Sequence, residues 1–420
     1  MAKVIKTDLV PVHIAADLLK VSADTIRRWH KKGLIKATVG LHGERLFSKD
    51  EITRVTKKGS ASDKPWKVLQ APKSKLTAIE LFCGAGGLAL GMHNAGINSK
   101  LLVDFDKDSI KTLQQNRPEW NSTCASVMDI DLHEYKSAID IMAGGFPCQS
   151  FSYAGKSLGF ADTRGTLFYE YARLIDQVKP RLVIGENVKG LLNHDEGRTL
   201  SAIVNELENL GYRVACKVLR AQFLDVPQKR ERLIIFGIRK DIDSQIFFPA
   251  EKDYTISMRA ALKGVPKSPG QVYSEAKRSV MDLIPEGGYW RDLSIELQKS
   301  FMGGSFHLGG GKTGMARRLS WSEPSLTLTC NPAQKQTERC HPKETRPLTV
   351  REYARIQTFP DEWVFTGSVS SQYKQIGNAV PVNLGYHVGL AARKILGVPT
   401  RNAEDAATFI AAQMQDPTLF

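Results

Sequence analysis

The sequence of 420 residues contains no apolar run of 18 residues and no leader in which charged residues precede an apolar stretch. The first absence argues against a transmembrane helix and the second against a secretory signal, so we expect a soluble, cytoplasmic protein. Cysteine is scarce and scattered, because no two of the six cysteines form a CxxC pair. We therefore expect neither a disulfide framework nor a bound metal.

What the sequence does have is positive charge. Lys and Arg outnumber Asp and Glu by 58 to 44, and residues 1–75 alone carry 17 basic against 7 acidic side chains. Such clustering favours a polyanionic partner, nucleic acid first, over a charge that only keeps the protein in solution. An apolar content of 42% allows true cores, and the length predicts two or three domains.

Residues 1–58 are predicted to form a domain of their own. "HIAADLLK" predicts a short amphipathic helix, "VSADTIRRWHKKG" a basic helix, and "IKATVGLHGERLF" a β-ribbon. "SKDEI" then opens another helix with a capping box of Ser48 and Glu51. This order resembles the winged helix-turn-helix of MerR-type regulators, whose second helix enters the major groove of DNA. A small helical domain for protein contacts is the alternative. The DNA contacts that the resemblance implies are Thr25, Arg27, Arg28, Lys31 and Arg45.

The rest of the chain changes character several times. Residues 59–75 have no periodicity and carry Gly, Ser, Pro and Lys, which predicts a linker. Over residues 76–240 apolar strands alternate with helices, which predicts an α/β fold with a doubly wound, mainly parallel, Rossmann-like sheet. The Gly-rich, basic segment 241–345 predicts a separate small lobe. The α/β pattern returns in residues 346–395, and residues 396–420 are expected to form a tail.

"IELFCGAGGLALG" predicts a strand, a Gly-rich turn and a helix. Glycines let a ligand approach the backbone, and a helix N-terminus favours a negative group. Asp104 ends the next strand, about 20 residues on, where a carboxylate can hold a ribose diol. The pattern fits NAD as well as S-adenosylmethionine. The alternative is a tight turn between strand and helix that binds no ligand. The order Gly84-Ala85-Gly86-Gly87 departs from the GxGxxG that a dinucleotide needs, which favours S-adenosylmethionine.

A thiol stands at the head of the loop "GGFPCQSFSYAGK". Cys148 follows the strand "AIDIMAGG", so we expect it at the carboxyl edge of the sheet, where doubly wound sheets bind ligands. Glu186 ends the strand "RLVIGEN" and should lie at the same edge, while Arg230 and Arg232 are spaced to share one face of a strand. A nucleophile, an acid and cations around one pocket suit methyl transfer to C5 of cytosine, since a thiolate can add at C6.

Seven motifs resemble those of the C5-cytosine DNA methyltransferases, in that family's order: "FCGAGG", "VDFD", "GGFPCQSFS", "GENVKGL", "QKRERL", "RPLTVREYARIQTFP" and "QIGNAVPV". The resemblance covers residues 76–395. It implies a sequence-specific methyltransferase of a restriction–modification system, acting as a monomer on a flipped-out cytosine in double-stranded DNA. It implies Cys148 as the nucleophile and Glu186 as the contact to N3 and the exocyclic amine. Arg232 would contact O2, with Arg230 beside it.

The resemblance implies S-adenosylmethionine as the cofactor. Phe82 and the glycines of the turn would surround its methionine part, Asp104 its ribose, and Phe105 its adenine. Asp129 would lie near the adenine amine, although the "MDID" stretch also offers Asp131. The full set of implied cofactor contacts is Phe82, Gly84, Gly86, Gly87, Asp104, Phe105, Asp129, Ile130, Pro147 and Asn378.

The resemblance also implies how DNA is held. The loop that begins at Cys148 would close over the extruded base, with Gln149 and Ser152 at the backbone phosphates or in the space left in the duplex. Segment 241–345 corresponds to the target-recognition region. Its basic residues that could reach base edges or phosphates are Lys312, Arg317 and Arg318.

Two other functions stay open. The N-terminal domain would make the chain a transcriptional regulator, one that represses its own operon. A structured RNA would be a different methyl acceptor, as it is for the tRNA-modifying relatives of the family. The DNA-type winged helix and the large lobe at 241–345 favour DNA over RNA.

Overall fold

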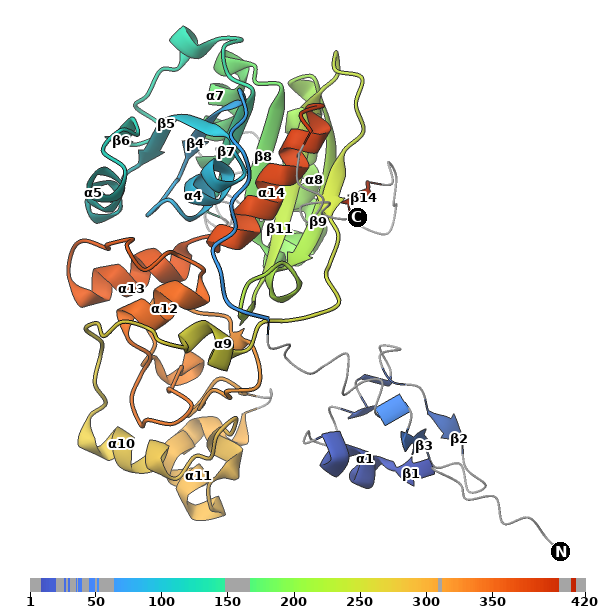
Figure 1. Ribbon diagram of the computed structural model, residues 1–420, viewed down its shortest axis with the longest axis vertical. Coiled ribbons are helices and arrows are strands. Elements are labelled where there is room, and N and C mark those ends of the chain that lie inside the picture. The colour runs from blue at the N-terminus through green and yellow to red at the C-terminus, as the bar shows by residue number, and fades with distance from the viewer. Residues whose placement is uncertain are drawn as a thin grey trace, which may run out of the picture. The chain divides into compact units, whose positions relative to one another are not determined.

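The computed structural model describes residues 9–19, 26–27, 29–30, 35, 37–39, 45–49, 51–52, 64–147, 167–308, 312–399 and 409–412. The chain divides into two compact units: residues 1–62 with 253–255, and residues 63–252 with 256–420 (Figure 1). Within the described ranges, no helix combines the length and the apolar character that crossing a membrane requires.

The first unit contains a three-stranded antiparallel sheet. β1 (Leu9–Pro11) pairs with β3 (Arg45–Ser48), which also pairs with β2 (Thr38–Val39). The pairing of β2 with β3 confirms the predicted ribbon. The hydroxyl oxygen of Ser48 accepts a hydrogen bond from the backbone N–H of Glu51 at 3.1 Å, which confirms the N-cap half of the predicted capping box.

Helix α1 (Val12–Leu19) packs against this sheet around a small core. Ile26 is fully buried and Trp29 packs on the same core, so the two residues share a face as predicted. Arg27 and Arg45 are exposed, whereas the other predicted DNA contacts of this unit, Thr25, Arg28 and Lys31, lie outside the described residues. The buried residues of the core are Ala15, Ala16, Ile26, Ile35, Phe47 and Ile52.

A seven-stranded sheet organises the second unit, in the order β6-β5-β4-β7-β8-β11-β9. Strands β4 to β8 are parallel, and β11 runs antiparallel to both of its neighbours. The chain moves outward from β4 to β6 and then returns to β7 on the other side of β4, which confirms the doubly wound, mainly parallel sheet. The strands are β4 (Thr77–Leu81), β5 (Asn98–Asp104), β6 (Ser122–Cys124), β7 (Ile141–Gly144), β8 (Leu182–Val188), β9 (Tyr212–Arg220) and β11 (Glu231–Arg239).

Helices cover both faces of this sheet (Figure 1). α4 (Gly87–Asn94) and α14 (Val382–Ile395) share one apolar core with the strands, and α7 (Leu167–Val178) and α8 (Arg198–Asn209) share the other. α5 (Lys107–Asn116) flanks the β5–β6 edge. Because both faces are covered, the central strands are apolar throughout rather than alternating, as the sequence predicted.

Between β11 and α12 (Val350–Ile356) the chain leaves the sheet and forms a lobe with its own apolar core. The lobe contains α10 (Glu275–Asp282) and α11 (Ile295–Met302). Its strand β13 (Ser325–Leu326) pairs in parallel with β10 (Gln228–Lys229), directly before β11. The lobe is therefore tied to the edge of the sheet. Its buried apolar residues are Met281, Ile284, Trp290, Leu293, Met302, Met315, Ala316 and Cys340.

The remaining elements pack around this framework. α9 (Met258–Leu262) and α13 (Val369–Asn378) share a core with α5 and α12. In the predicted C-terminal tail, β14 (Phe409–Ala411) pairs antiparallel with β12 (Phe247–Pro249), so this part of the tail is an edge strand. The short 3₁₀ helices are His133–Tyr135, Lys189–Gly197, Ala221–Phe223, Trp290–Asp292, Gly303–His307 and Lys335–Thr337.

Residues 64–75 of the predicted linker are bound to the second unit. The indole N–H of Trp66 donates to the carbonyl of Arg355 at 2.9 Å, and the Arg355 guanidinium lies 4.9 Å from the centre of the Trp66 ring. The N–H of Leu69 donates to the side-chain oxygen of Asn383 at 3.0 Å. The lack of periodicity predicted correctly that no helix or strand forms here. The lack of periodicity could not predict that backbone groups of this segment form hydrogen bonds with residues of neighbouring helices.

This docking predicts a loss of stability for Trp66→Ala. The change removes a hydrogen bond and a cation–π contact, so the free energy of unfolding should fall by about 1–3 kcal/mol in urea denaturation. The matched control is Lys67→Ala, since the Lys67 side chain is exposed and only its backbone carbonyl is bound. Equal stability of the two variants would mean that residues 64–75 are only a tether.

Candidate active site

The direction of β11 brings two predicted site residues together. Because β11 is antiparallel to β8, its first residues lie at the carboxyl end of β8, with Arg232 opposite Val188 and Ile234 opposite Glu186. The Nε of Arg232 lies 2.7 Å from Oε1 of Glu186, and both side chains are only 12% exposed. A largely desolvated carboxylate and guanidinium are thus paired at the edge of the sheet where ligands bind.

The loop that carries Cys148 starts beside this pair. Cys148, Gln149 and Ser152 lie outside the described residues. The turn before them is held in place, because the side-chain amide of Asn187 donates to the carbonyl of Phe146 at 2.9 Å. A Cβ added to Gly145 would lie 3.2 Å from Oε2 of Glu186.

Arg230 does not share a strand face with Arg232, contrary to the sequence prediction. The ladder is interrupted between β10 and β11, and the Arg230 side chain turns inward until it is 2% exposed. Its guanidinium donates to three backbone carbonyls, those of Leu328 at 3.1 Å, Gly377 at 3.0 Å and Ala379 at 3.1 Å. Burial, and then the charge of Arg232, lower the pKa of Arg230. The prediction that Arg230 helps to hold the base is therefore revised, since its donors are directed at the backbone.

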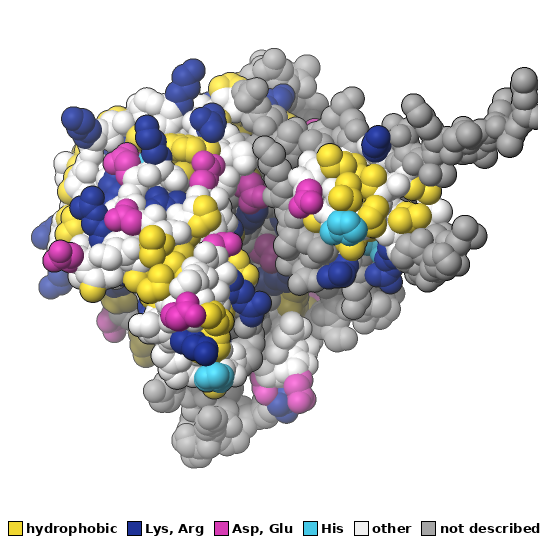
Figure 2. Space-filling view, turned by 90° about the horizontal axis from the view of Figure 1, so that it is seen from below, with side chains coloured by type: hydrophobic (Ala, Val, Ile, Leu, Met, Phe, Trp, Pro, Cys, Tyr) yellow, Lys and Arg dark blue, Asp and Glu magenta, His cyan; other side chains and the backbone are white. Residues whose placement is uncertain are grey.

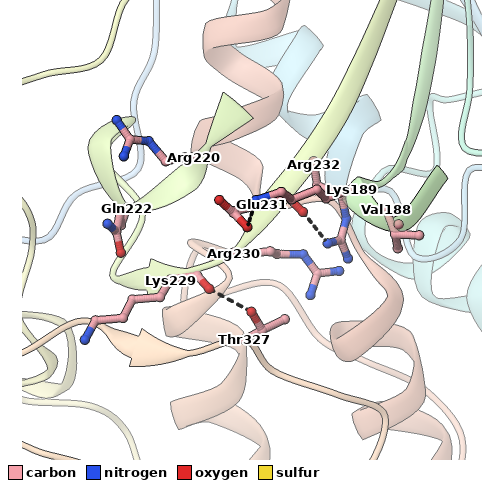
Figure 3. A pocket seen from close by; sticks show the side chains of 10 residues that line it. Val188, Lys189, Arg220, Gln222, Lys229, Arg230, Glu231, Arg232 and Thr327 are labelled. Atoms are coloured by element: carbon pink, nitrogen blue, oxygen red, sulfur yellow. Dashed lines mark hydrogen bonds and ion pairs between the residues drawn. The ribbon is translucent and has the colours of Figure 1, made fainter. Parts of the chain in front are cut away.

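A cavity of about 450 Å³ opens beside the Glu186–Arg232 pair (Figure 3). This volume lies in the range of about 300–1,000 Å³ that is typical of small-ligand sites. Glu231 lies 3.0 Å from Lys189 and is the only acidic residue of the lining. The lining is rich in cations, but four of them are paired with carboxylates: Lys189 with Glu231, Arg220 with Glu251, Lys229 with Glu323 and Arg232 with Glu186. The cationic residues of its lining are Lys189, Arg220, Lys229, Arg230 and Arg232.

The Gly-rich turn at the end of β4 has one glycine that faces open space. Gly84 has φ of +51°, and a Cβ added there would meet no atom within 4 Å. A Cβ on Gly86 would reach the Leu113 side chain at 2.5 Å, and a Cβ on Gly87 would overlap the carbonyl of Val380. Packing alone therefore requires glycine at 86 and 87, whereas Gly84 leaves room for a ligand to approach the backbone.

Asp104 and Phe105 lie at the end of β5, next to this turn. The Asp104 carboxylate accepts hydrogen bonds from the backbone N–H groups of Gly84 at 2.7 Å and Asp106 at 2.8 Å. Burial raises the pKa of Asp104, and these two bonds oppose that rise. Phe105 is 71% exposed, which is unusual for a phenylalanine, and Phe82 has a strained positive φ of 56°. A fixed carboxylate beside an exposed ring suits a ribose with an adenine.

The other predicted cofactor residues are spread more widely. Asp129 is exposed, and Ile130 is half-buried. The Asp131 carboxylate accepts hydrogen bonds from the backbone and ring nitrogens of His133, at 2.9 and 2.6 Å. The "MDID" stretch offered Asp129 and Asp131 as candidates for the adenine amine. Asp131 is already hydrogen-bonded to His133, which favours Asp129. Pro147 is exposed directly before the Cys148 loop.

Glu80, on β4, was missed in the sequence. It is 3% exposed, and its Oε2 has no hydrogen-bond partner among the described residues. Burial first, then the charges of Asp104 and Glu186, raise its pKa well above the usual value. Buried carboxyl groups with raised pKa values gather at functional sites. The available signal was an acidic residue inside the otherwise apolar strand "TAIEL".

The predicted DNA contacts of the lobe differ in how far they are buried. Arg318 is 5% exposed and donates to the carbonyls of Met281, Ile284, His341 and Lys343 and to the Thr345 hydroxyl. We therefore correct the prediction for Arg318, because its donors hold the lobe together and cannot reach DNA. Arg317 is half-buried over the ring of Tyr289, at 5.7 Å.

Three further observations bear on where ligands bind. The Lys312 ammonium donates to the carbonyls of Ser305 and Leu308. On the face seen in Figure 2, basic, acidic and apolar side chains are mixed, with no surface of one sign. Among the described residues, no group of three His, Cys, Asp or Glu side chains could hold a metal ion.

Residues 76–394 match the family described as C-5 cytosine-specific DNA methylase, and residues 11–57 match the MerR HTH family of regulatory proteins. The chain belongs to the C-5 cytosine-specific DNA methylases. Both resemblances seen in the sequence are thereby confirmed, as is the activity class of a DNA (cytosine-5)-methyltransferase.

Named relatives and solved structures agree with this assignment. The type II methyltransferase M.Eco47II of Escherichia coli is 51% identical, over 91% of this chain and 94% of that protein. M.PspPI of a Psychrobacter species, also a type II methyltransferase, is 49% identical over 93% and 97%. The structure of a DNMT2 mutant from Spodoptera frugiperda, 15% identical, matches 76% of this chain and 99% of that one with a TM-score of 0.55, which shows the shared fold.

The raised pKa of Glu80 predicts a pH-dependent stability difference. The folded state keeps this proton above pH 4.5, where the unfolded chain loses it, so its stabilising effect is complete at lower pH and declines as pH rises. Glu80→Gln cannot ionise. Its stability relative to wild type should therefore increase between about pH 5 and pH 8, by at most about 1.4 kcal/mol per pH unit. Thermal unfolding of both proteins measures this, and parallel curves would contradict it.

Proposed function

We propose that this chain transfers a methyl group from S-adenosylmethionine to C5 of a flipped-out cytosine in double-stranded DNA. The reaction passes through a covalent bond between Cys148 and C6 of the base. One observation carries the proposal: the desolvated Glu186–Arg232 pair lies against the start of the Cys148 loop. We infer that one edge of the pyrimidine meets the pair while C6 faces the Cys148 loop.

The pair is complementary to one edge of cytosine. O2, N3 and the exocyclic amine follow one another along that edge of the ring. A guanidinium donates to O2, while the neighbouring carboxyl group serves N3 and the amine, so Arg232 and Glu186 match the base when side by side. Low exposure strengthens these contacts, because water competes little for them.

The chemistry assigns one step to each residue. The thiolate of Cys148 adds to C6, and the electron pair of the C5–C6 double bond moves toward C5 while Glu186 and Arg232 stabilise charge at N3 and O2. C5 would then bond to the methyl carbon while the bond from that carbon to sulfur breaks, so that the sulfur leaves as a neutral thioether. Loss of the C5 proton to a solvent base and departure of the thiolate restore the double bond. S-adenosylmethionine supplies an electrophilic methyl group on a positively charged sulfur.

The residues around β4 and β5 fit that cofactor. Asp104 would bind the ribose diol, exposed Phe105 would cover the adenine, and Gly84 offers open backbone to the methionine part. Glu80 adds a buried carboxyl group whose Oε2 has no hydrogen-bond partner among the described residues, and the ammonium group of the cofactor would donate to it. Asn378 and Asp129 complete the proposed set.

Double-stranded DNA is the proposed substrate, and protection from a cognate restriction endonuclease the proposed role. Five cationic side chains line the cavity, and DNA phosphates would take the place of the carboxylates that now pair with four of them. The type II methyltransferases at about half identity support the role in restriction–modification. The MerR-like match at residues 11–57 favours DNA over a structured RNA.

The nucleophile predicts one decisive variant. Duplex DNA with 5-fluorocytosine in the target site should form a stable adduct, because fluorine at C5 blocks the final elimination. Cys148→Ala should form none and should lower methyl transfer by at least about a thousandfold. The matched control is Cys216→Ala, since burial raises the pKa of that thiol to about 12 and keeps it unreactive. An adduct that survives in Cys148→Ala would show that another residue attacks.

A second function, repression of the chain's own operon, is favoured by the MerR-like match and by the excess basic charge of residues 1–75. Full-length protein should protect a specific stretch of its upstream promoter in a footprint. Arg45→Ala should weaken that protection and leave methylation of the target site within about twofold, since Arg45 belongs to the separate unit. Protection without any sequence preference would leave this unit only a general DNA-binding role.

A further inference from the structure

The segment Gly377–Val380, which we call the junction loop, is the end of α13 with the two residues after it, and it lies between the cofactor turn and the lobe. On one side it packs against the first turn of α4, where a Cβ on Gly87 would overlap the carbonyl of Val380. On the other side a Cβ on Gly377 would overlap the carbonyl of Thr329 in the lobe. Two glycines thus allow three segments, distant in the sequence, to approach at backbone distance.

Buried side chains hold this contact. Arg230 joins the carbonyl of Leu328, in the lobe, to the carbonyls of Gly377 and Ala379, in the junction loop. These last two carbonyls end α13, where a cation is favoured by the helix dipole. Removal of the guanidinium would take a hydrogen bond from each of these three carbonyls in a place that excludes water, and among the described residues only that of Ala379 would keep a second donor, Gln357.

Two glutamines reinforce the same connection, and both are completely buried. Gln228 accepts a hydrogen bond from the N–H of Leu328 at 2.9 Å and donates to the side chain of Gln357 at 2.7 Å. Gln357 in turn donates to the carbonyl of Ala379 at 3.0 Å. A satisfied polar network of this kind fixes one arrangement of the segments that it joins.

The network surrounds a residue proposed for the cofactor. The thiol of Cys330, in the lobe, donates to the side-chain oxygen of Asn378, in the junction loop, at 3.0 Å. Cys330 is exposed to solvent, so a reagent can reach it. Its reactivity therefore reports on whether lobe and loop are in contact.

We propose that Arg230 is a positioning residue that fastens the recognition segment Leu328–Cys330 to the junction loop, and through that loop to the cofactor turn. Cofactor affinity then depends on the recognition segment being in place. The inference rests on the proposed function for the identity of the cofactor. Arg230 also lines the cavity, but its guanidinium donates to backbone carbonyls, so the role at the base is assigned to Arg232 alone.

Three variants and one matched control test this. Arg230→Met removes the three bonds, Arg230→Lys keeps the charge and part of the bonding, and Gly377→Ala drives the junction loop and Thr329 apart without loss of charge. The control is Arg393→Met. Arg393 is 3% exposed and also donates to three backbone carbonyls, but these belong to Pro72 before β4, Ala95 at the far end of α4 and Pro399 beyond α14.

Two measurements are made on full-length protein. The dissociation constant of S-adenosylmethionine is measured by calorimetry, and the rate at which iodoacetamide labels Cys330 by peptide mass spectrometry. In Arg230→Met and Gly377→Ala the dissociation constant should rise about tenfold or more and labelling should accelerate several-fold, because a displacement near 1 Å is enough. Arg230→Lys should lie between these and wild type. In Arg393→Met the dissociation constant and the labelling rate should both stay within about twofold of the wild-type values. This should hold even if its melting temperature falls as much as that of Arg230→Met.

If Arg230→Met and Gly377→Ala match the control in both measurements, Arg230 has a purely structural role and the inference is overturned. Equal effects in Arg393→Met would overturn it as well. The proposed function fails separately, by absence of methylcytosine in DNA treated with wild-type protein. The labelling rate of Cys330 still tests the junction in that case.

Discussion

The ion pair between Glu186 and Arg232 depends on the direction of a single strand. Were β11 parallel to β8, Arg232 would begin its strand at the opposite end of the sheet, far from the carboxyl edge. The antiparallel insertion places it across from the end of β8, so that an acid from one motif and a cation from another meet at 2.7 Å. The cavity, the start of the Cys148 loop and the Gly-rich turn all lie around that edge.

The arginines of this chain show how burial and partner decide a role. Arg232 meets a carboxylate at a cavity, where a substrate can share or replace its partner. Arg230, Arg318 and Arg393 instead donate to backbone carbonyls that no ligand would displace, and they join segments far apart in the sequence. A guanidinium can satisfy several carbonyls at once, because it carries five donors in a fixed plane. The same side chain therefore serves both as a substrate contact and as a structural clamp.

The sequence was most informative where periodicity and strand ends carry the signal. Mainly apolar strands predicted the doubly wound sheet, and from it followed that Glu186 would lie at the carboxyl edge. Arg232 reaches the same edge only because β11 runs antiparallel, which the pattern did not predict. Prediction failed where the outcome depends on distant partners. A spacing of two residues placed Arg230 beside Arg232, but a break in the ladder turned Arg230 inward. A basic, Gly-rich setting suggested DNA for Arg318, whose carbonyl partners come from other turns of the lobe.

The same limit applies to backbone segments and to buried acids. Neither residues 64–75 nor residues 409–411 have a sequence pattern that predicts their partners. Residues 64–75 nevertheless pack on helices, and residues 409–411 pair with β12. Glu80 interrupts an apolar strand, and a pattern of hydrophobicity treats it as an exception rather than as a member of the site. The role of Glu80 becomes apparent only in the folded sheet, which brings Asp104 and Glu186 near it.

A crystal structure of the full-length protein, trapped on duplex DNA with 5-fluorocytosine in its target site, tests the central claim most directly. The account predicts an everted pyrimidine with C6 bonded to the sulfur of Cys148. The Glu186 carboxyl group should lie within hydrogen-bond distance of N3, and the Arg232 guanidinium within that of O2. A trapped base whose ring edge meets neither Glu186 nor Arg232, or whose C6 is bonded to another residue, would contradict it.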